Sequence, residues 1–322
     1  MSVSGTIAVT GATGFVGRHA VRELLGRGFG VRGLVRDLGK AADVLGTHER
    51  LELVCGDVCD PKTLGELLSG CVALVNTVGI IRESDGQTFQ KLHVVAVRKL
   101  LEAMASAGCD RIVHVSALSV SEAAKTGYGK SKFEGERLIR SAGARWTILR
   151  PGLIHGRDGE FTKLAVEWAR GRIAPFLFMP YFSKMTGGFP KPAFESPLVQ
   201  PIAVEDVASA IAESLEREVA VGEVYPLAGG ETLDWPELLE FVRDNVTLAR
   251  QGIKAMGIPG DLAAMKAKGA GLLGVGALLP FDEGMAKMGA ADSVSPTTKA
   301  REHLELAPAG FREAASGYLG GM

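Results

Sequence analysis

Short apolar runs alternate with longer amphipathic segments over the first 150 residues of the chain. The short runs are nearly continuous in Val, Ile and Leu, which is typical of strands buried on both faces. They are residues 6–10, 31–36, 51–56, 73–79, 111–116 and 146–150. Apolar residues recur at helical spacing in residues 15–28, 61–70, 89–108 and 128–143. This alternation predicts an α/β fold, a doubly wound parallel sheet of the Rossmann type with helices on both faces.

The pattern becomes less regular after Pro151. Three further elements are predicted: a helix at 204–216, a strand at 223–230 and a helix at 233–244. Asp234 is the expected N-cap of the last helix, because Glu237 follows it by three residues. We therefore predict a dinucleotide-binding Rossmann core at 1–150. Residues 151–322 form a mixed segment that completes the sheet and builds a small C-terminal lobe on the substrate side.

Composition narrows the class of protein. The 322 residues are 46% hydrophobic and 23% charged, which is typical of a globular protein. The net charge is −1, so the chain has no overall positive charge that would attract nucleic acid. No apolar run reaches the roughly 20 residues that span a bilayer, and the nearest candidate, residues 269–281, is short and glycine-rich. The four cysteines have no histidine at ligand spacing, which predicts buried free thiols and no metal site. Without the features of a secretory signal, we expect a cytoplasmic protein, or one peripheral to the inner membrane.

The stretch TIAVTGATGFVG carries the strongest functional signal. A predicted strand ends at Thr10, and Gly11, Gly14 and Gly17 then lead into a helix. In such a loop the first glycine permits a tight turn and the second lets the backbone approach a pyrophosphate. The third allows close packing of the helix, whose N-terminus faces the anion. The context of strand, loop and amphipathic helix predicts a dinucleotide site.

The end of the second predicted strand bears on the choice of dinucleotide. An acidic residue there accepts hydrogen bonds from the adenosine ribose and favours NAD, whereas a guanidinium suits a 2′-phosphate. Arg36 stands at this point and Asp37 follows it. We therefore expect NADP(H) as the preferred cofactor, with NAD(H) as the alternative.

Several further motifs accompany the glycine loop. They are GDVCD at 56–60, NTVG at 76–79, HVSALS at 114–119, YGKSK at 128–132 and ILRPGLIHG at 148–156. Together with TGATGFVG they resemble the extended, atypical branch of the short-chain dehydrogenase/reductase superfamily, the epimerase/dehydratase type. Within it, Y-x-x-SK-x-x-GE and QPIAVEDVA are similar to bacterial relatives of the NADPH-binding accessory subunit of respiratory complex I.

The resemblance implies roles for individual residues. Tyr128 is the expected acid/base, and Lys132, four residues on and on the same helix face, holds the nicotinamide ribose and lowers the pKa of the phenol. The usual serine is less defined, because Leu118 stands near its position and Ser116 and Ser119 are the neighbouring hydroxyls. The expected cofactor-binding residues are Gly11, Thr13, Gly14, Phe15, Val16, Gly17, Arg36, Asp57, Val58, Thr77, Val78, Gly79, Lys132, Pro151, Gly152, Leu153 and Ile154.

Substrate contacts are assigned to His93, His155 and Tyr181. The apolar stretch at 176–182 favours a quinone- or isoprenoid-like small molecule, and no arginine pair for a sugar diphosphate stands out between 160 and 205. The first hypothesis is an NADP(H)-dependent oxidoreductase acting on a carbonyl or alcohol. The second is a non-catalytic NADPH-binding structural, assembly or redox-sensing protein, and a nucleotide-sugar epimerase is less favoured. A homodimer or a protein complex is compatible with either.

Overall fold

The computed structural model describes residues 5–84, 86–124, 126–187, 191–272 and 281–322. The described residues form two compact units. Unit 1 is Met1–Pro151, Val204–Leu227 and Pro296–Ala307, and unit 2 is Gly152–Ala203, Ala228–Ser295 and Pro308–Met322. Most of the glycine-rich run at 269–281 lies outside the described residues. Within the described ranges, no helix is both long enough and apolar enough to cross a bilayer.

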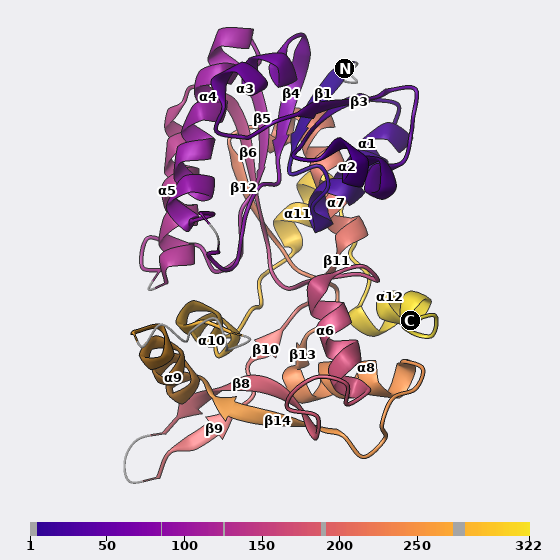
Figure 1. The fold of residues 1–322 in the computed structure, drawn as a ribbon, viewed down its shortest axis with the longest axis vertical. Helices are drawn as coiled ribbons and strands as arrows, with labels where there is room; N and C mark the ends of the chain where they lie inside the picture. Colours follow the sequence, from indigo (N-terminus) through magenta and orange to yellow (C-terminus); the bar gives the residue numbers. More distant parts are fainter. Residues whose placement is uncertain (1–4, 85, 125, 188–190, 273–280) are drawn as a thin grey trace. The chain divides into compact units, whose positions relative to one another are not determined.

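Unit 1 is built on a parallel sheet that has seven strands in the described part of the chain (Figure 1). The strands are β1 (Thr6–Thr10), β2 (Gly30–Val35), β3 (Leu51–Cys55), β4 (Cys71–Asn76), β5 (Arg111–Val115), β6 (Arg145–Pro151) and β12 (Glu223–Leu227). Their order is β12-β6-β5-β4-β1-β2-β3, and every pair is parallel. The chain therefore runs outward in one direction from β1 and in the other from β4. In open α/β sheets, ligands bind beyond the carboxyl ends of the strands at such a switch point.

Helices cover both faces of this sheet (Figure 1). The helices of unit 1 are α1 (Phe15–Gly26), α2 (Leu38–Leu45), α3 (Pro61–Leu68), α4 (Ala96–Ala107), α5 (Gly127–Ser141), α7 (Val204–Glu216) and α11 (Thr298–Leu304). α3, α4 and α5 pack side by side, and α1 packs against α7, which also contacts α11. A π-helical turn, η1 (Gln90–Val95), precedes α4, and a short 3-10 turn, η2 (Glu218–Ala220), precedes β12.

The strands are buried because both of their faces carry apolar side chains. All five residues of β5 are buried, including Arg111 and His114. One core cluster joins Leu74, Ile112 and Ile148 of the sheet to side chains of α3, α4 and α5, such as Leu100 and Ile139. The predicted doubly wound fold is confirmed, and so are its six strands.

Two helices of unit 1, α2 and the seven-residue α11, were not predicted. α2 begins after Asp37, whose carboxylate accepts a hydrogen bond from the Lys40 amide (3.1 Å). Its eight residues expose most of their surface, and Ala41 is its buried residue. A helix this short presents too little apolar periodicity to be recognised from the sequence.

Unit 2 has its own small sheets and helices. Its elements are β7 (Ile154–His155), α6 (Glu160–Ala169), β8 (Phe178–Thr186), β9 (Ala193–Glu195), β10 (Leu198–Val199), β11 (Ile202–Ala203), β13 (Leu233–Asp234), α8 (Trp235–Asn245), β14 (Lys254–Pro259), α9 (Gly260–Leu272), α10 (Glu283–Gly289) and α12 (Phe311–Leu319). Its core packs α6, α8 and α12 around Met179, Leu238 and Phe311. The capping box that Asp234 and Glu237 were expected to form at the start of α8 is confirmed.

Candidate nucleotide-binding and catalytic site

The loop between β1 and α1 lies at the carboxyl edge of the sheet in unit 1. Gly11 has a φ of +72°, in the left-handed region that favours glycine, and the Gly14 amide donates to the Gly11 carbonyl (2.8 Å). A Cβ at Gly17 would lie 2.0 Å from the Gly11 oxygen, so α1 can approach the loop this closely only with glycine at that position. The loop is therefore a tight turn directly before a helix N-terminus, the arrangement that binds anions.

Gly14 differs from its two neighbours in what surrounds it. It is exposed, and its φ and ψ of −69° and 170° suit any L-residue. Among described atoms within 4 Å, a Cβ at Gly14 would meet the Gly11 oxygen alone, at 3.1 Å. Protein packing therefore gives little reason for glycine here, whereas a pyrophosphate resting against the backbone does. The residues of this loop fit a dinucleotide.

The carboxyl end of β2 leaves one cation available. The Asp37 carboxylate is used as the cap of α2, while Arg36 is exposed and makes no ion pair or side-chain hydrogen bond with any described residue. Arg32, by contrast, is bound to Glu52 (Nε–Oε2 2.7 Å) and to the Ser69 carbonyl at the end of α3 (2.5 Å). Of these two arginines, Arg36 is therefore the one whose guanidinium remains open to a ligand.

The loops after β3 and β4 contribute the next predicted residues. The Asp57 carboxylate accepts from the Cys59 amide (2.7 Å), which orders the turn that also contains the half-buried Val58. The Thr77 hydroxyl donates to the Thr10 carbonyl (2.8 Å) and so ties this loop to the end of β1. Thr77 and Val78 are half-buried beside the glycine loop, since a Cβ at Gly11 would lie 2.7 Å from Thr77 Oγ1 and 3.2 Å from the Val78 nitrogen.

Tyr128 and Lys132 occupy the first turns of α5, which begins after Thr126, whose hydroxyl accepts from the Gly129 amide (3.1 Å). Both side chains are buried, at 9% and 4% exposure. Burial raises the pKa of Tyr128 to about 12 and lowers that of Lys132 to about 8, although the charge of Glu136 partly opposes the second shift. The expected lowering of the Tyr128 pKa by Lys132 is therefore wrong, because burial sets the direction. The Tyr128 hydroxyl makes no hydrogen bond to any described residue, whereas Lys132 Nζ donates to the Val115 carbonyl (3.0 Å).

Gly79 marks where this helix meets the loop after β4. A Cβ placed on Gly79 would lie 3.0 Å from Lys132 Nζ and 3.6 Å from His93 Nε2. The structure therefore brings the loop after β4, the π-helical turn η1 and α5 together at the carboxyl edge of the sheet. Lys132 and His93 are the polar side chains that face this point.

His93 is connected to the site through both ring nitrogens. The Ile80 amide donates to Nε2 (3.2 Å), so Nδ1 carries the proton and donates to the Ser131 hydroxyl (2.9 Å). Ser131 in turn donates to the Tyr128 carbonyl (2.9 Å). The His93 ring stacks on Phe89 (centroids 5.5 Å apart) and meets the edge of Tyr128 (5.6 Å). Burial and the Lys132 charge lower the pKa of His93 to about 3, so the ring is neutral.

The hydroxyls predicted as a third catalytic member have different surroundings. Ser116 is buried and donates to the Glu136 carboxylate (2.6 Å), which Arg150 also binds (Nε–Oε1 2.8 Å). Its proton is therefore directed away from a ligand. Ser119 is exposed, in the turn that follows β5.

Sequence reasoning missed Ser131 and Glu136 as residues that support the site. The signal for both was their spacing on α5. Ser131 follows Tyr128 by three residues and Glu136 follows Lys132 by four, so each lies on the same helix face as the residue it follows.

Thr13, Phe15 and Val16 are half-buried in unit 1, before and at the start of α1, and Pro151 ends β6 in the same unit. The other predicted residues belong to unit 2. Gly152, Leu153 and Ile154 follow Pro151 and are half-buried. His155 has no exposed surface: Nδ1 is 3.0 Å from the Tyr318 hydroxyl, and burial lowers its pKa to about 4. Tyr181 on β8 is half-buried, and its pKa is raised by burial and by the Asp234 charge. Roles for these residues in ligand binding stay predictions.

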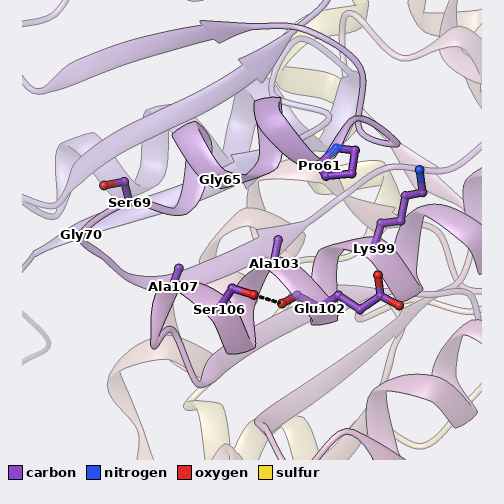
Figure 2. A pocket seen from close by; sticks show the side chains of 9 residues that line it. All are labelled: Pro61, Gly65, Ser69, Gly70, Lys99, Glu102, Ala103, Ser106 and Ala107. Carbon is purple, nitrogen blue, oxygen red and sulfur yellow. Dashed lines mark hydrogen bonds between the residues drawn. The ribbon is translucent and has the colours of Figure 1, made fainter.

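A hollow of about 490 Å³ lies between α3 and α4 of unit 1 (Figure 2). Pro61, Gly65, Ser69 and Gly70 line one side, and Lys99, Glu102, Ala103, Ser106 and Ala107 the other. The Ser106 hydroxyl bonds to the Glu102 carbonyl within α4 and Lys99 donates to the Cys59 carbonyl, so these groups serve the fold. The described residues contain no cluster of His, Cys, Asp or Glu that could hold a metal ion. All four cysteines are free thiols, but the prediction that they are buried is wrong for the exposed Cys55 and the half-buried Cys59, which lie at and after the end of the edge strand β3.

Known proteins match this chain in sequence and in fold. Residues 11–171 match the family model described as NAD(P)H-binding. The chain is 34% identical to ceramide reductase of Caulobacter vibrioides over 174 residues, 54% of each chain. It is 28% identical over 249 residues, 75% of this chain and 64% of the relative, to NADH dehydrogenase (ubiquinone) 1 alpha subcomplex subunit 9, mitochondrial, of Dictyostelium discoideum. The matches thus span less than two thirds of the length of either relative.

A solved structure agrees at the level of the fold. UDP-glucuronic acid 4-epimerase from Bacillus cereus, in complex with NAD, superposes with a TM-score of 0.70 over 98% of both chains at 18% identity. The family model and the sequence relatives confirm the resemblance found in the motifs. The glycine loop, the strand order and the matched family model together establish that the chain belongs to the NAD(P)H-binding proteins of the short-chain dehydrogenase/reductase type.

Proposed function

We propose that this protein is an NADP(H)-dependent oxidoreductase that reduces a carbonyl group of an apolar small molecule. The observation that carries the proposal is the buried pair Tyr128 and Lys132 on one face of α5, at the edge of the sheet that follows the glycine loop. The Tyr128 hydroxyl has no hydrogen-bond partner among the described residues, as expected of a group reserved for a substrate oxygen.

The protonation states of the pair favour reduction. With a pKa of about 12, Tyr128 holds its proton at neutral pH, and with a pKa of about 8 Lys132 is charged. Bound NADPH would supply the hydride that reaches the carbonyl carbon. Tyr128 then donates its phenolic proton to the carbonyl oxygen, and the ammonium of Lys132 stabilises the phenolate that remains until solvent reprotonates it. A neutral His93 fits this site, because a second cation would oppose protonation of Lys132.

Ser131 and His93 act as positioning residues in this proposal. The hydrogen bonds from His93 through Ser131 to the Tyr128 carbonyl fix the start of α5. The bond from the Ile80 amide fixes the loop after β4 on the same ring. The His93 side chain thus sets the spacing between Tyr128 and the loop after β4, which is expected beside the nicotinamide.

The preference for NADP(H) rests on Arg36 and Asp37. The open guanidinium suits a 2′-phosphate, whereas the Asp37 carboxylate that would bind a ribose is used as a helix cap. The apolar substrate class is supported by the relative named ceramide reductase. A quinone- or isoprenoid-like carbonyl compound would meet the same requirement.

A second candidate function is a non-catalytic NADPH-binding component of a protein complex. The Ser116 hydroxyl is engaged by Glu136, and Leu118 stands where the family's serine is expected, which removes one usual donor to the substrate oxygen. The relative named as an NADH dehydrogenase subunit supports the same alternative. In that case Tyr128 and Lys132 hold the ribose without proton transfer.

Tyr128→Phe separates the two candidates. Consumption of NADPH is measured with a panel of apolar ketones, aldehydes and quinones, and the Kd of NADPH is measured in parallel. An oxidoreductase should lose about 100-fold or more in kcat, the range for a general acid, with the Kd of NADPH unchanged. Tyr225→Phe, a buried tyrosine of β12 whose hydroxyl binds His303, is the matched control and should keep its turnover. Equal turnover by parent and Tyr128→Phe would refute the assigned mechanism, and the absence of turnover with tight NADPH binding would favour the second candidate.

A further inference from the structure

Two loops of unit 2 expose large apolar side chains. Phe176 and Leu177, in the connection between α6 and β8, are 52% and 73% exposed. Leu248, in the connection between α8 and β14, is 76% exposed. We call these three residues the apolar tip. Exposed side chains of this size are found at surfaces that contact another molecule when they gather in one place.

The two loops are joined by hydrogen bonds. The Arg250 amide donates to the Ala169 carbonyl (2.9 Å), and Arg170 Nε donates to the Thr247 carbonyl (3.1 Å). Arg250 Nη1 also reaches the Phe176 carbonyl (3.3 Å). The residues flanking the apolar tip therefore form one surface, and their guanidinium groups bind backbone of the neighbouring loop.

Two residues of the apolar tip also have an unfavourable backbone. Phe176 has a φ of 61° and Leu248 a φ of 62°, in the left-handed region that residues with bulky side chains rarely adopt. The chain thus holds an exposed phenylalanine and an exposed leucine in conformations that Asn or Gly would adopt at lower cost. Such local costs persist where a function requires the side chain.

Cations outnumber carboxylates around the apolar tip. Residues 170–178 and 246–254 contain Arg170, Arg172, Arg250 and Lys254 and no acidic residue, in a chain whose net charge is −1. Glu167 pairs with the two arginines that follow α6 (3.2 and 3.7 Å), which leaves a cationic excess. No ion pair joins Arg250 or Lys254 to a described carboxylate.

We propose that the apolar tip inserts into the interfacial region of an anionic phospholipid membrane, while Arg172 and Lys254 contact its headgroups. Apolar side chains surrounded by Lys and Arg are the pattern of surface-bound proteins that do not span the bilayer. Charge complementarity favours a lipid surface, since anionic headgroups match a cationic rim and the acyl region accepts leucine and phenylalanine.

The test uses the full chain and vesicles of two compositions, phosphatidylcholine alone and phosphatidylcholine mixed with phosphatidylglycerol. Binding is measured by flotation and should require the anionic lipid and weaken with added salt. Arg172→Gln with Lys254→Gln should weaken it about 25-fold, from about fivefold for each cation near an anionic surface. Arg170 and Arg250 are left in place because they hold backbone carbonyls.

A second variant removes the apolar tip itself. Phe176→Asn and Leu248→Asn suit the left-handed backbone, and with Leu177→Ser they should weaken binding by at least about tenfold for each inserted side chain. Val219→Ser, at a 50% exposed position of unit 1, is the control and should bind as the parent does. Thermal unfolding verifies that each variant is folded.

Three results would overturn the proposal: failure of the parent to bind either vesicle, equal binding to both vesicles, or unchanged binding by the triple variant. A concentration-dependent dimer that the triple variant loses would also overturn it, because the surface would then be an interface between proteins.

Discussion

Replacing Gly14 by alanine should remove dinucleotide binding and leave the free protein nearly as stable as before. The backbone at Gly14 suits alanine, and the new methyl would meet the Gly11 oxygen at 3.1 Å. Alanine reduces the conformational freedom of the unfolded chain, which stabilises the folded protein by about 0.4–1 kcal/mol. Loss of glycine as the N-cap of α1 destabilises it by a similar amount. The two effects nearly cancel, whereas the methyl occupies the space expected for a pyrophosphate.

The size of the effect follows from mass action. At an NADPH concentration of about 100 times its Kd, the ligand stabilises the parent by about 2.7 kcal/mol. For a chain of this size that corresponds to an increase of about 4 °C in Tm. If alanine weakens binding about 100-fold, the same concentration stabilises by about 0.4 kcal/mol, or less than about 1 °C.

Gly17→Ala is the matched comparison in the same loop. Its Cβ would lie 2.0 Å from the Gly11 oxygen, so α1 or the loop has to move. We expect the free protein to lose about 1–3 kcal/mol, the usual cost of overpacking. Thermal unfolding of parent and both variants, each with and without NADPH, separates the two effects. A full NADPH shift in Gly14→Ala, or a loss of stability equal to that of Gly17→Ala, would refute the pyrophosphate placement.

Three further predictions concern charge. Arg36→Ala should weaken NADPH binding about tenfold or more and leave NADH binding unchanged, as measured by paired thermal titrations, and equal effects on both would contradict the NADP(H) preference. Burial lowers the pKa of Lys132 to about 8, so between pH 8 and 10 the unfolded chain binds a proton that the folded protein does not. The free energy of unfolding should therefore rise by up to about 3 kcal/mol over this range. Urea denaturation should show no such rise for Lys132→Met. Burial lowers the pKa of His155 to about 4, so its neutral form stabilises the fold above pH 6.5. About 3 kcal/mol of the free energy of unfolding should be lost as the pH falls from 6.5 towards 4. His155→Gln should reduce this acid sensitivity, and an unchanged pH profile would show that the buried ring does not titrate.

The sequence by itself determined the class of fold and the main anchor of the nucleotide. Strands such as β5 are continuous in apolar residues, and the helices between them have clear periodicity, so local pattern and tertiary burial agree. Gly11, Gly14 and Gly17 were recognisable by their spacing, because the turn requires the first, a pyrophosphate the second and close helix packing the third. Tyr128 and Lys132 could be paired for a similar reason, since residues four positions apart on a helix share a face.

Only the tertiary structure decided how polar side chains are shared between segments far apart in sequence. His93 lies 38 residues from Ser131, and Ser116 lies 20 from Glu136, so neither hydrogen bond has a periodic signal. The assignment of Asp37 to a helix cap, which leaves Arg36 open, also depends on how the chain turns after β2. A pattern records which residues are buried, but the partner of a buried polar group is fixed by where the folded backbone brings its donors and acceptors.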